Sequence, residues 1–370
     1  MLKNKAICIT IFVIFVFLSA AALAQNDKNH ISYTHPKKIN PLVILTREDN
    51  LKELKSQIKT QKITLKNNPL GYELLQVASL NCHYDIIKYL LDADVSPNKD
   101  KYFNLNQISK SSFTPLSDVV AFCKSIKPVK LLVSRGANIN SSEIPLNSAI
   151  YFNKIDVSKY LIDNGANVNA GDKHNIYPID LSVAMYKGEI LDYLLQHHVL
   201  INVRHGNTTP LLEAINDNNH DAFLKLIEHG ADINFSNNQG LTPLMKATAK
   251  RDIDIVSLLI KHGADVNSDS YHFGKYSATA LDLAVNNNDL TITQLLIQHG
   301  ADVNKPNNCG ITPLMAAAGN GNLKMVKLLV NNGVIISAVA MHGGTALSWA
   351  GFGKHWEVAN YLRDKLLTER

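Results

Sequence analysis

The sequence has little cysteine and tryptophan: 4 Cys and 2 Trp occur among its 370 residues. A fold held together by many disulfides is therefore excluded, because a chain of this length buries a sizeable apolar core without crosslinks. The motifs of common catalytic sites are also missing. The chain contains no Gly-x-Ser-x-Gly elbow, no His-Glu-x-x-His, no Cys-x-x-Cys and no Walker loop. We expect no enzymatic activity, no metal site and no cofactor.

Long apolar runs are absent except at the N-terminus. Two lysines within the first five residues precede an apolar run over 6–18, and an Ala-Leu-Ala triplet ends at Ala24. This order is typical of a secretory signal peptide cleaved before Gln25. The alternative is an uncleaved membrane anchor, because the uncharged stretch 6–24 has 19 residues, near the lower limit for crossing a bilayer. The short apolar run favours cleavage, and we expect an exported protein, periplasmic or secreted.

Charge is concentrated in one segment. The whole sequence has a formal net charge of +5, and residues 25–68 hold nine basic and four acidic residues. A basic leading segment can contact an anionic membrane or an acidic partner, although such a segment is more often the solvated face of a helix. The rest of the chain has no basic stripe. We therefore expect no nucleic-acid partner.

One phrase occurs three times. Residues 228–247 read EHGADINFSNNQGLTPLMKA, KHGADVN begins 33 residues later, and residues 298–317 read QHGADVNKPNNCGITPLMAA. Gly230, Gly263 and Gly300 each follow an apolar run, and glycine supplies the left-handed backbone that ends a helix. In Thr-Pro-Leu, threonine suits the N-cap and proline the first helical position. The phrase therefore predicts a helix end, a turn and a helix start.

The proline position of this phrase recurs along the chain, most often every 33 residues. A 33-residue period with a Thr-Pro-Leu start and a Gly-Ala-Asp-Val-Asn end resembles the ankyrin repeat family. The resemblance covers residues 41–370 and implies an all-α solenoid of about ten helix-turn-helix units with short hairpin-like turns. It also implies binding to a partner protein, and we expect a monomer. The aligned positions are Pro41, Leu74, Pro115, Pro145, Pro178, Pro210, Pro243, Ala280, Pro313 and Ala346.

This pattern sets the expected organisation and shows two departures from the family. We expect a signal peptide over 1–24, a linker over 25–40 and repeats over 41–370, with a degenerate N-terminal cap (41–73) and a C-terminal cap (346–370). Asn153, Asn218 and Asn288 replace the glycine between the two helices, and asparagine tolerates the left-handed conformation. Family members often carry, two residues after the proline, a histidine that ties neighbouring turns together. That position here holds Ser117, Asn147, Asp180, Leu212, Met245, Asp282, Met315 and Ser348.

Three cysteines remain after signal cleavage: Cys82, Cys123 and Cys309. The first two take the same place, between the two helices, in neighbouring repeats. An oxidising compartment permits a bridge between them, but packed helices lie roughly 8–10 Å apart, beyond the reach of an undistorted disulfide. We expect separate buried thiols, with the bridge as the alternative.

The resemblance implies that partner-binding residues lie at turn tips and at the ends of first helices, which line a concave face. Three consecutive units place apolar, mostly aromatic side chains at those ends, and the following units place Asn216, Asp217, Lys250, Asn286 and Asn287 there. We expect the apolar residues to contact the partner, with packing inside the stack as the alternative. These residues, called the aromatic strip below, are Phe122, Tyr151, Phe152, Met185 and Tyr186.

Two connections are longer than the period requires, and both contain aromatic residues. Extra length is inexpensive in a surface turn, but such loops often lie on the binding side of repeat proteins. We therefore predict a second set of partner-binding residues. They are Tyr102 and Phe103 in the first insertion and Tyr271, Phe273 and Tyr276 in the second.

Four histidines occupy equivalent places in successive units: His197, His229, His262 and His299. Zinc ligands lie about 2 Å from the metal, whereas neighbouring repeats are separated by roughly 8–10 Å. One ion cannot join two of these histidines. We expect them to be structural.

The sequence thus predicts an exported, non-catalytic scaffold that presents a concave surface to a partner protein. Richness in Asn, Lys and Ile beside a signal peptide resembles exported bacterial ankyrin repeat proteins. One alternative is an ankyrin-type effector of an intracellular bacterium that binds a host protein. The others are a protein docked on a membrane through residues 25–68 and a small-ligand-binding protein.

Overall fold

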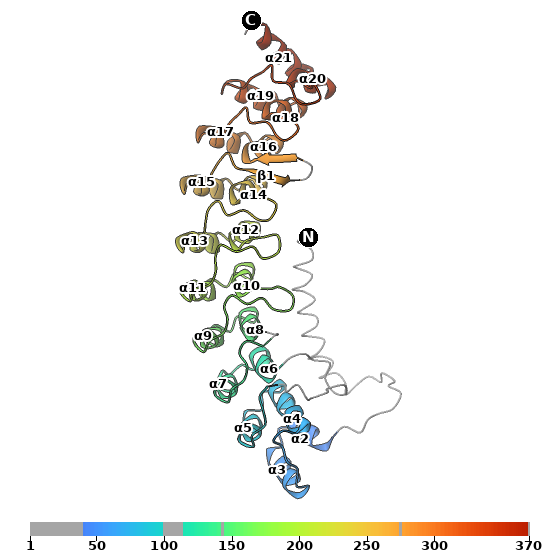
Figure 1. Ribbon diagram of the computed structural model, residues 1–370, viewed down its shortest axis with the longest axis vertical. Helices are drawn as coiled ribbons and strands as arrows, with labels where there is room; N and C mark the ends of the chain where they lie inside the picture. The colour runs from blue at the N-terminus through green and yellow to red at the C-terminus, as the bar shows by residue number, and fades with distance from the viewer. Residues whose placement is uncertain (1–39, 99–113, 142–143, 274–275, 369–370) are drawn as a thin grey trace, which may run out of the picture. The chain divides into compact units, whose positions relative to one another are not determined.

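The computed structural model describes residues 40–98, 114–141, 144–273 and 276–368. Within these ranges, twenty helices from α2 to α21 follow one another in ten pairs (Figure 1). The chain divides into two compact units, residues 1–145 and 146–370. The expected all-α solenoid is confirmed, and the described residues add one two-stranded hairpin in the second unit. No helix in the described ranges has both the length and the apolar character needed to cross a membrane.

The first unit contains three helix pairs, in which α4 contacts both α2 and α6, and α5 contacts α7. Helix α4 begins five residues before Leu74, the position that the repeat spacing predicts. The side chain of Asn68 caps it by accepting from the amide of Leu70, and Pro69 takes the first helical position. The helices are α2 (Pro41–Arg47), α3 (Leu51–Thr60), α4 (Pro69–Leu80), α5 (Tyr84–Asp92), α6 (Pro115–Phe122) and α7 (Lys127–Ser134).

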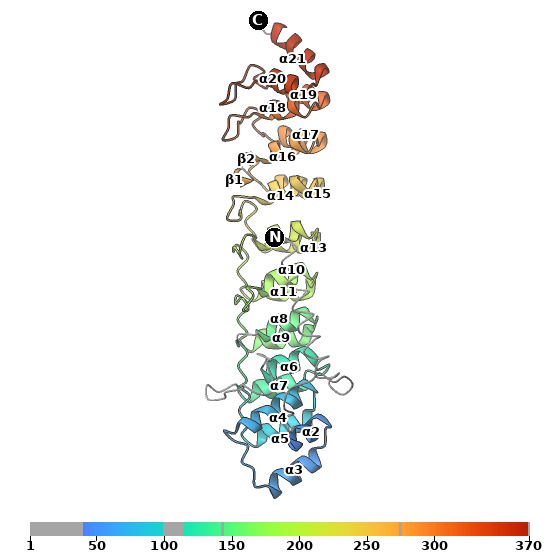
Figure 2. The ribbon, with the colours of Figure 1, turned by 90° about the vertical axis from the view of Figure 1, so that its right-hand side faces the viewer.

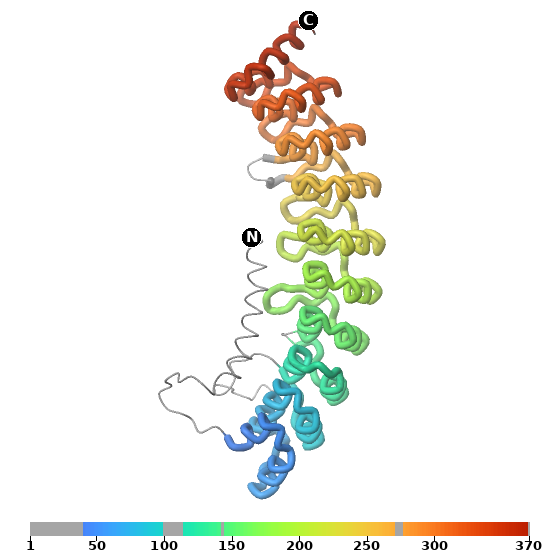
Figure 3. Tube along the Cα trace, turned by 180° about the vertical axis from the view of Figure 1, so that it is seen from behind, coloured from blue at the N-terminus to red at the C-terminus, as the bar shows by residue number. Residues whose placement is uncertain are grey.

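In the second unit the first helices of the repeats form one layer and the second helices form another (Figures 1 and 3). The first helices are α8 (Pro145–Tyr151), α10 (Pro178–Ala184), α12 (Pro210–Asn216), α14 (Pro243–Lys250), α16 (Ala280–Asn286), α18 (Pro313–Gly319) and α20 (Ala346–Phe352). The second helices are α9 (Ile155–Asp163), α11 (Gly188–Gln196), α13 (His220–Glu228), α15 (Ile253–Lys261), α17 (Leu290–Gln298), α19 (Leu323–Val330) and α21 (Trp356–Thr368).

The recurring phrase has the local structure that its residues predict. The side chains of Thr209, Thr242 and Thr312 cap α12, α14 and α18, each accepting from the amide three residues later. Gly230, Gly263 and Gly300 all adopt a φ of +87° just beyond a second helix. Asn153, Asn218 and Asn288 are left-handed as well, with φ values of 54°, 56° and 54°. The repeats that carry the phrase therefore begin their first helices and end their second helices by the same local chemistry.

The asparagine that closes the phrase joins each turn to the next repeat. The Nδ2 of Asn267 donates to the carbonyl of Gly300 at 2.9 Å, and its Oδ1 accepts from the amide of Asp302 at 2.8 Å. Asn202 and Asn304 make the same two contacts with their following turns. These bonds satisfy backbone groups that a turn leaves unpaired, so the phrase holds neighbouring repeats in register.

Polar residues two positions after the proline also tie turns together, without the family's histidine. The Nδ2 of Asn147 donates to the carbonyl of Ile176 at 2.7 Å. Asp180 lies 2.9 Å from Nδ1 of His205, and both side chains are largely buried. The tie between turns is therefore kept by an amide in one repeat and by an aspartate–histidine pair in another.

The expectation of separate thiols in the first unit is wrong. Cys82 and Cys123 form a disulfide with a Cα–Cα distance of 5.4 Å. Cys82 has a left-handed φ of 62° in the turn after α4, and Cys123 is the C-cap of α6. The spacing of helix axes does not limit the contact, because both residues lie at turns beyond the helix ends. The third cysteine of the described ranges, Cys309, is free.

Candidate protein-binding groove

The aromatic strip is divided between the two units. Phe122 ends α6 in the first unit and is half-buried. In the second unit, the half-buried rings of Tyr151 and Phe152 meet edge to face, with centroids 5.1 Å apart. Burial raises the pKa of the Tyr151 hydroxyl. These three rings offer only part of their surface to solvent.

The next members of the strip lie beyond the end of α10. Met185 is half-buried, and Tyr186 is 59% exposed. The hydroxyl of Tyr186 nevertheless donates to the carbonyl of Asp217 in the following repeat. Part of this side chain is thus engaged by the array itself. The assignment of the strip to partner binding stays a prediction.

The two insertions are described unequally. Tyr102 and Phe103 lie outside the described residues. Tyr271 and Phe273 belong to strand β1 (Asp269–Phe273), and Tyr276 belongs to strand β2 (Tyr276–Thr279). For these three residues the structure describes the backbone and not the side chains. Their role in binding therefore also stays a prediction.

A groove of about 780 Å³ lies along the last three repeats. Its lining comes from strand β2, from the C-terminal ends of α16, α18 and α20, and from the turn over residues 307–312. The first-helix ends were the expected place for a binding surface, but the groove lies further along the chain than the aromatic strip. We take it as the candidate functional site.

Small residues on α18 create the hollow. Ala316 and Gly319 line the groove, and a Cβ added to Gly319 would lie 2.9 Å from Cε3 of Trp349. On the other edge of the indole, a Cβ on Gly344 would lie 2.7 Å from Nε1. Glycine at these two positions therefore leaves room for the Trp349 ring to lie in the groove wall.

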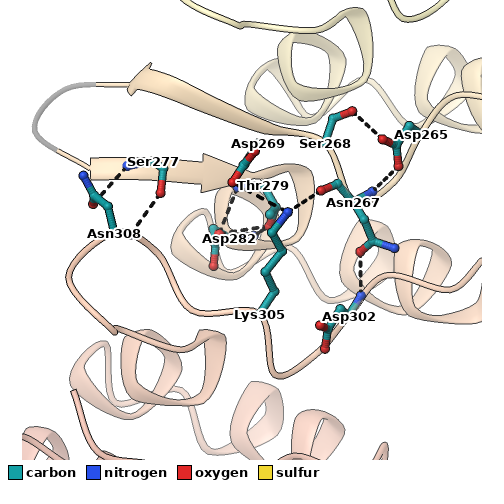
Figure 4. Close-up of polar contacts among 10 residues, drawn as sticks. All are labelled: Asp265, Asn267, Ser268, Asp269, Ser277, Thr279, Asp282, Asp302, Lys305 and Asn308. Atoms are coloured by element: carbon teal, nitrogen blue, oxygen red, sulfur yellow. Dashed lines mark hydrogen bonds and ion pairs between the residues drawn. The ribbon is translucent and has the colours of Figure 1, made fainter. Parts of the chain in front are cut away.

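The inserted hairpin forms another wall and is held by the next turn (Figure 4). Strands β1 and β2 pair in antiparallel register, with Asp269 opposite Thr279. The amide of Ser277 donates to Oδ1 of Asn308 at 3.2 Å, and the amide of Asn308 donates to Oγ of Ser277 at 3.0 Å. Figure 2 shows the hairpin on the side of the helices where the turns lie. The insertion thus extends the turn surface next to the groove.

Lys305 fastens the base of the hairpin from the same turn (Figure 4). Its Nζ donates to the carbonyl of Asn267 at 2.6 Å and lies 3.6 Å from a carboxylate oxygen of Asp269. The surrounding bonds shape the start of β1: Asp265 accepts from the hydroxyl of Ser268, which lowers the pKa of the Asp265 carboxyl. The wall is therefore fixed by contacts at both of its ends.

Exposed aromatic residues lie at the C-terminal end of the groove. Phe352 lines it and is 87% exposed, and Trp349 lines it beside Phe352. Trp356, at the start of α21 in the same repeat, does not line the groove and is 63% exposed. The chain has 2 tryptophans, and both lie in this cap repeat. Exposed tryptophan and phenylalanine are typical anchors of protein interfaces.

Amide side chains supply the polar part of the lining. Asn286 and Asn287 at the end of α16 and Asn320 after α18 line the groove. Within the described ranges, the side chains of these three asparagines bond to no other residue. Each has free donor and acceptor atoms. The groove therefore has aromatic side chains at one end and asparagine side chains without protein hydrogen-bond partners in two of its repeats.

The lining contains one ionisable residue. Asp282 accepts from the amide and the hydroxyl of Thr279, both at 2.9 Å. Burial raises the pKa of the Asp282 carboxyl, and these bonds from Thr279 offset part of that effect. The carboxyl serves as a capping-box partner for α16. No charged side chain of the lining is thus free to pair with a ligand.

Trp349 and Phe352 were not predicted, although the sequence contains a signal for Phe352. The aromatic strip was predicted at positions six to eight residues after the proline position, and all of it but Tyr186 lies at positions six and seven. The same count in the last two repeats gives Gly319, Asn320, Phe352 and Gly353, all of which line the groove. The hollow itself had no such signal, because it depends on which side chains fill the space between helix ends.

Three of the four equivalent histidines contact the last turn of their own second helix. The Nδ1 atoms of His197, His229 and His299 lie 2.7, 2.8 and 2.9 Å from the carbonyl four residues earlier in their own helices. These contacts satisfy carbonyls of the last helical turn. In the ranges that the structure describes, no three His, Cys, Asp or Glu side chains gather as metal ligands would.

Comparison with known proteins agrees with this architecture. A family model described as ankyrin repeats in three copies matches residues 181–270, 224–307 and 281–368, and a single-repeat model matches residues 142–173. The chain belongs to the ankyrin repeat family. Membership in this family suggests a scaffold for protein–protein interaction. The groove lies within the residues that the family model matches.

The relatives of these ankyrin repeats come from distant organisms. Alpha-latrocrustotoxin-Lt1a of Latrodectus tredecimguttatus is 30% identical over 183 residues, 45% of this chain and 13% of the toxin. A putative ankyrin repeat protein of Acanthamoeba polyphaga mimivirus is 27% identical over 222 residues, 58% of each chain. The chain thus spans less than two thirds of these relatives.

A solved structure shows the same ankyrin fold. The ankyrin repeat domain of Bcl-3, described as a unique member of the IkappaB protein family, is 26% identical in sequence. The match has a TM-score of 0.54 and covers 59% of this chain and 97% of the Bcl-3 domain.

Proposed function

We propose that this protein is an exported, non-catalytic scaffold that binds a partner protein through the groove of its last three repeats. The observation that carries the proposal is the placement of Trp349 and Phe352 on a groove of about 780 Å³, with Phe352 87% exposed. In the unbound protein the exposed ring of Phe352 is in contact with water, which is unfavourable in free energy. Burial against a partner removes that cost, and interface anchors are commonly aromatic.

Two features support export. The N-terminal 24 residues have the order of a secretory signal. Cys82 and Cys123 are joined as a disulfide, and structural disulfides persist in oxidising compartments but are rare in the cytosol. A protein that keeps this bond in the cell would meet its partner outside the cytosol.

Partner capture with matched variants tests the groove. The chain from Gln25 onward is used as bait, beside Phe352→Ala and beside a strip variant carrying Phe152→Ala and Tyr186→Ala. We expect the strip variant to keep a specifically captured protein and Phe352→Ala to lose it. Both variants replace exposed or half-exposed rings, and circular dichroism checks that each is folded.

The opposite result would place the site elsewhere. If the strip variant loses the partner while Phe352→Ala keeps it, the aromatic strip predicted from the sequence is the binding surface and the groove is not. If both variants keep the partner, neither surface carries the interaction.

Export has its own test. We expect the chain recovered from its native source to begin at Gln25 and to show one free thiol, that of Cys309, when alkylated without reductant. Recovery of an uncleaved chain with three or more reactive thiols would contradict export and the oxidised state together.

A further inference from the structure

We infer that the groove takes a proline-rich segment of the partner in the polyproline II conformation, an inference that rests on the proposed function. The lining repeats from one first helix to the next: Asn286 and Asn287 on α16, Asn320 beyond α18, and Trp349 and Phe352 on α20. An elongated ligand along the groove meets one such set of side chains per repeat.

The spacing of the repeats favours this conformation over others. Packed helices lie roughly 8–10 Å apart. A polyproline II helix has three residues per turn and rises about 3.1 Å per residue, so one turn advances about 9 Å. A β-strand returns to the same face after about 6.7 Å, and an α-helix after about 5.4 Å. Of the three conformations, polyproline II is the one whose single turn matches this general spacing of packed helices.

The donors of the lining suit a ligand that offers acceptors. The amide groups of Asn286, Asn287 and Asn320 bond to no other residue in the described ranges, and the indole N–H of Trp349 has no acceptor there. A polyproline II segment has no internal hydrogen bonds, and proline has no N–H of its own. Its carbonyls are therefore free to accept from these four side chains.

The charge of the lining restricts the ligand further. Asp282, the one ionisable residue of the lining, is buried and bonded to Thr279. A charged side chain placed in the groove would lose water without gaining a counter-ion, which costs free energy. Prolyl rings are uncharged, so packing them against Trp349 and Phe352 requires no desolvation of a charge. Grooves lined by aromatic side chains recognise proline-rich segments in this way. The segment in the groove is therefore uncharged.

Tryptophan fluorescence tests the inference directly, because both tryptophans of the chain lie in the cap repeat. A Trp356→Phe variant leaves Trp349 as the reporter. The probe is a proline peptide of about ten residues, long enough for the roughly 20 Å of three repeats. Comparison peptides of equal length are a Gly-Ser chain and a proline chain with lysine at every third position. We expect saturable binding of the proline peptide and binding at least about tenfold weaker for the other two.

Matched variants show whether the amides take part. Asn286 and Asn216 are both the seventh residue of a first helix, α16 and α12, but only Asn286 lines the groove. We expect Asn286→Ala to weaken binding of the proline peptide several-fold and Asn216→Ala to leave it unchanged. Equal weakening by both variants, or equal binding of the Gly-Ser peptide, would overturn the inference.

Failure of the inference differs from failure of the proposed function. If the proline peptide causes no saturable change up to about 1 mM while Phe352→Ala still abolishes partner capture, the groove binds a segment of other chemistry. If the peptide fails and Phe352→Ala also leaves capture intact, both proposals are wrong.

Discussion

The two ends of the repeat array differ at the C-terminal ends of their first helices. In the first unit the turn after α4 is joined to the end of α6 by Cys82–Cys123, and Asp118 within α6 is only 1% exposed. In the last repeats the positions equivalent to the two cysteines hold Gly321 and Lys354, and a groove lined by Gly319 and Trp349 remains open. The same repeat backbone thus gives a closed surface at one end and an open groove at the other.

The middle repeats show how hydrogen bonds close this surface without a covalent bond. Nζ of Lys250, in α14, donates to the carbonyl of Ile215 at 3.1 Å and to that of Asn216. Arg251 donates to the carbonyl of Asn287 in the following repeat. Seven residues after the proline position, α18 has Asn320 where α14 has Lys250, and Asn320 reaches no neighbouring carbonyl in the described ranges. The side chain at this position therefore contributes, beside the small residues of α18, to whether the surface is closed or open.

Removing the disulfide should have the largest effect on stability. The crosslink spans 41 residues, and chain entropy for a loop of that size corresponds to about 4 kcal/mol. We expect the double variant Cys82→Ala, Cys123→Ala to lose roughly this amount in the first unit only. Hydrogen exchange resolved by peptide measures the two units separately, which matters because repeat arrays often unfold in parts.

The free cysteine provides the control for that experiment. Cys309→Ala should leave hydrogen exchange unchanged in both units, and reductant should reproduce the effect of the double variant. Equal loss in both units would show that the closed end does not have a stability of its own.

The buried carboxyl of the first unit should make its stability depend on pH. Burial raises the pKa of Asp118 well above its usual range, and the side chain of Gln76 offsets only part of this. The folded state therefore holds this proton more tightly than the unfolded state. Below about pH 4, the pKa of this carboxyl in the unfolded chain being about 3.9, the carboxyl is protonated in both states and does not lower the free energy of unfolding. As the pH rises from there to the pKa of the folded state, the free energy of unfolding falls.

Asp118→Asn removes that dependence. We expect the variant to gain on the order of 1–3 kcal/mol at neutral pH, the range for a buried polar group without full compensation, and nothing near pH 4. Urea unfolding followed across this pH range measures the difference. A variant that is less stable than the parent at neutral pH would mean that the ionised carboxyl is stabilised where it lies.

Closing the open end should weaken binding with little effect on folding. Asn320→Lys places the α14 side chain in α18, where its ammonium can reach the carbonyls of Val285 and Asn286. We expect partner binding to fall at least about tenfold, or about 1.4 kcal/mol, because the lysine fills the groove and adds a charge. Titration of the Trp349 signal measures it, with Asn332→Lys as a charge-matched control outside the groove lining. Unchanged binding would show that the ligand does not cross α18.

The reciprocal change should have the smallest effect. Lys250→Asn removes the donors to Ile215 and Asn216, whose carbonyls lie in the last turn of α12. Because water can replace these bonds at the surface, the loss should be about 1 kcal/mol or less. Faster hydrogen exchange confined to the end of α12 would confirm it, whereas a loss spread over several repeats would mean that Lys250 holds the stack together.

Much of the fold was predictable because helix starts, helix ends and turns depend on residues close together in the sequence. Thr242 as N-cap, Gly263 as helix end and Asn288 in the left-handed turn each act within a few residues of their own position. The start of α4 was less predictable, since Asn68 and Pro69 precede the position that the repeat spacing gives. The binding surface was predicted at first-helix ends in general, but not at Trp349 and Phe352 in particular.

The sequence by itself determined the repeat period, the pairing of helices and the helix ends, because caps and left-handed turns depend on neighbours in the chain. Only the tertiary structure decided the Cys82–Cys123 bond and the position of the groove. Both depend on distances between residues that lie thirty or more positions apart in the chain, such as the ring of Trp349 and Gly319. Those distances are set by how turns approach one another across repeats, which a helix spacing averaged over the stack does not give.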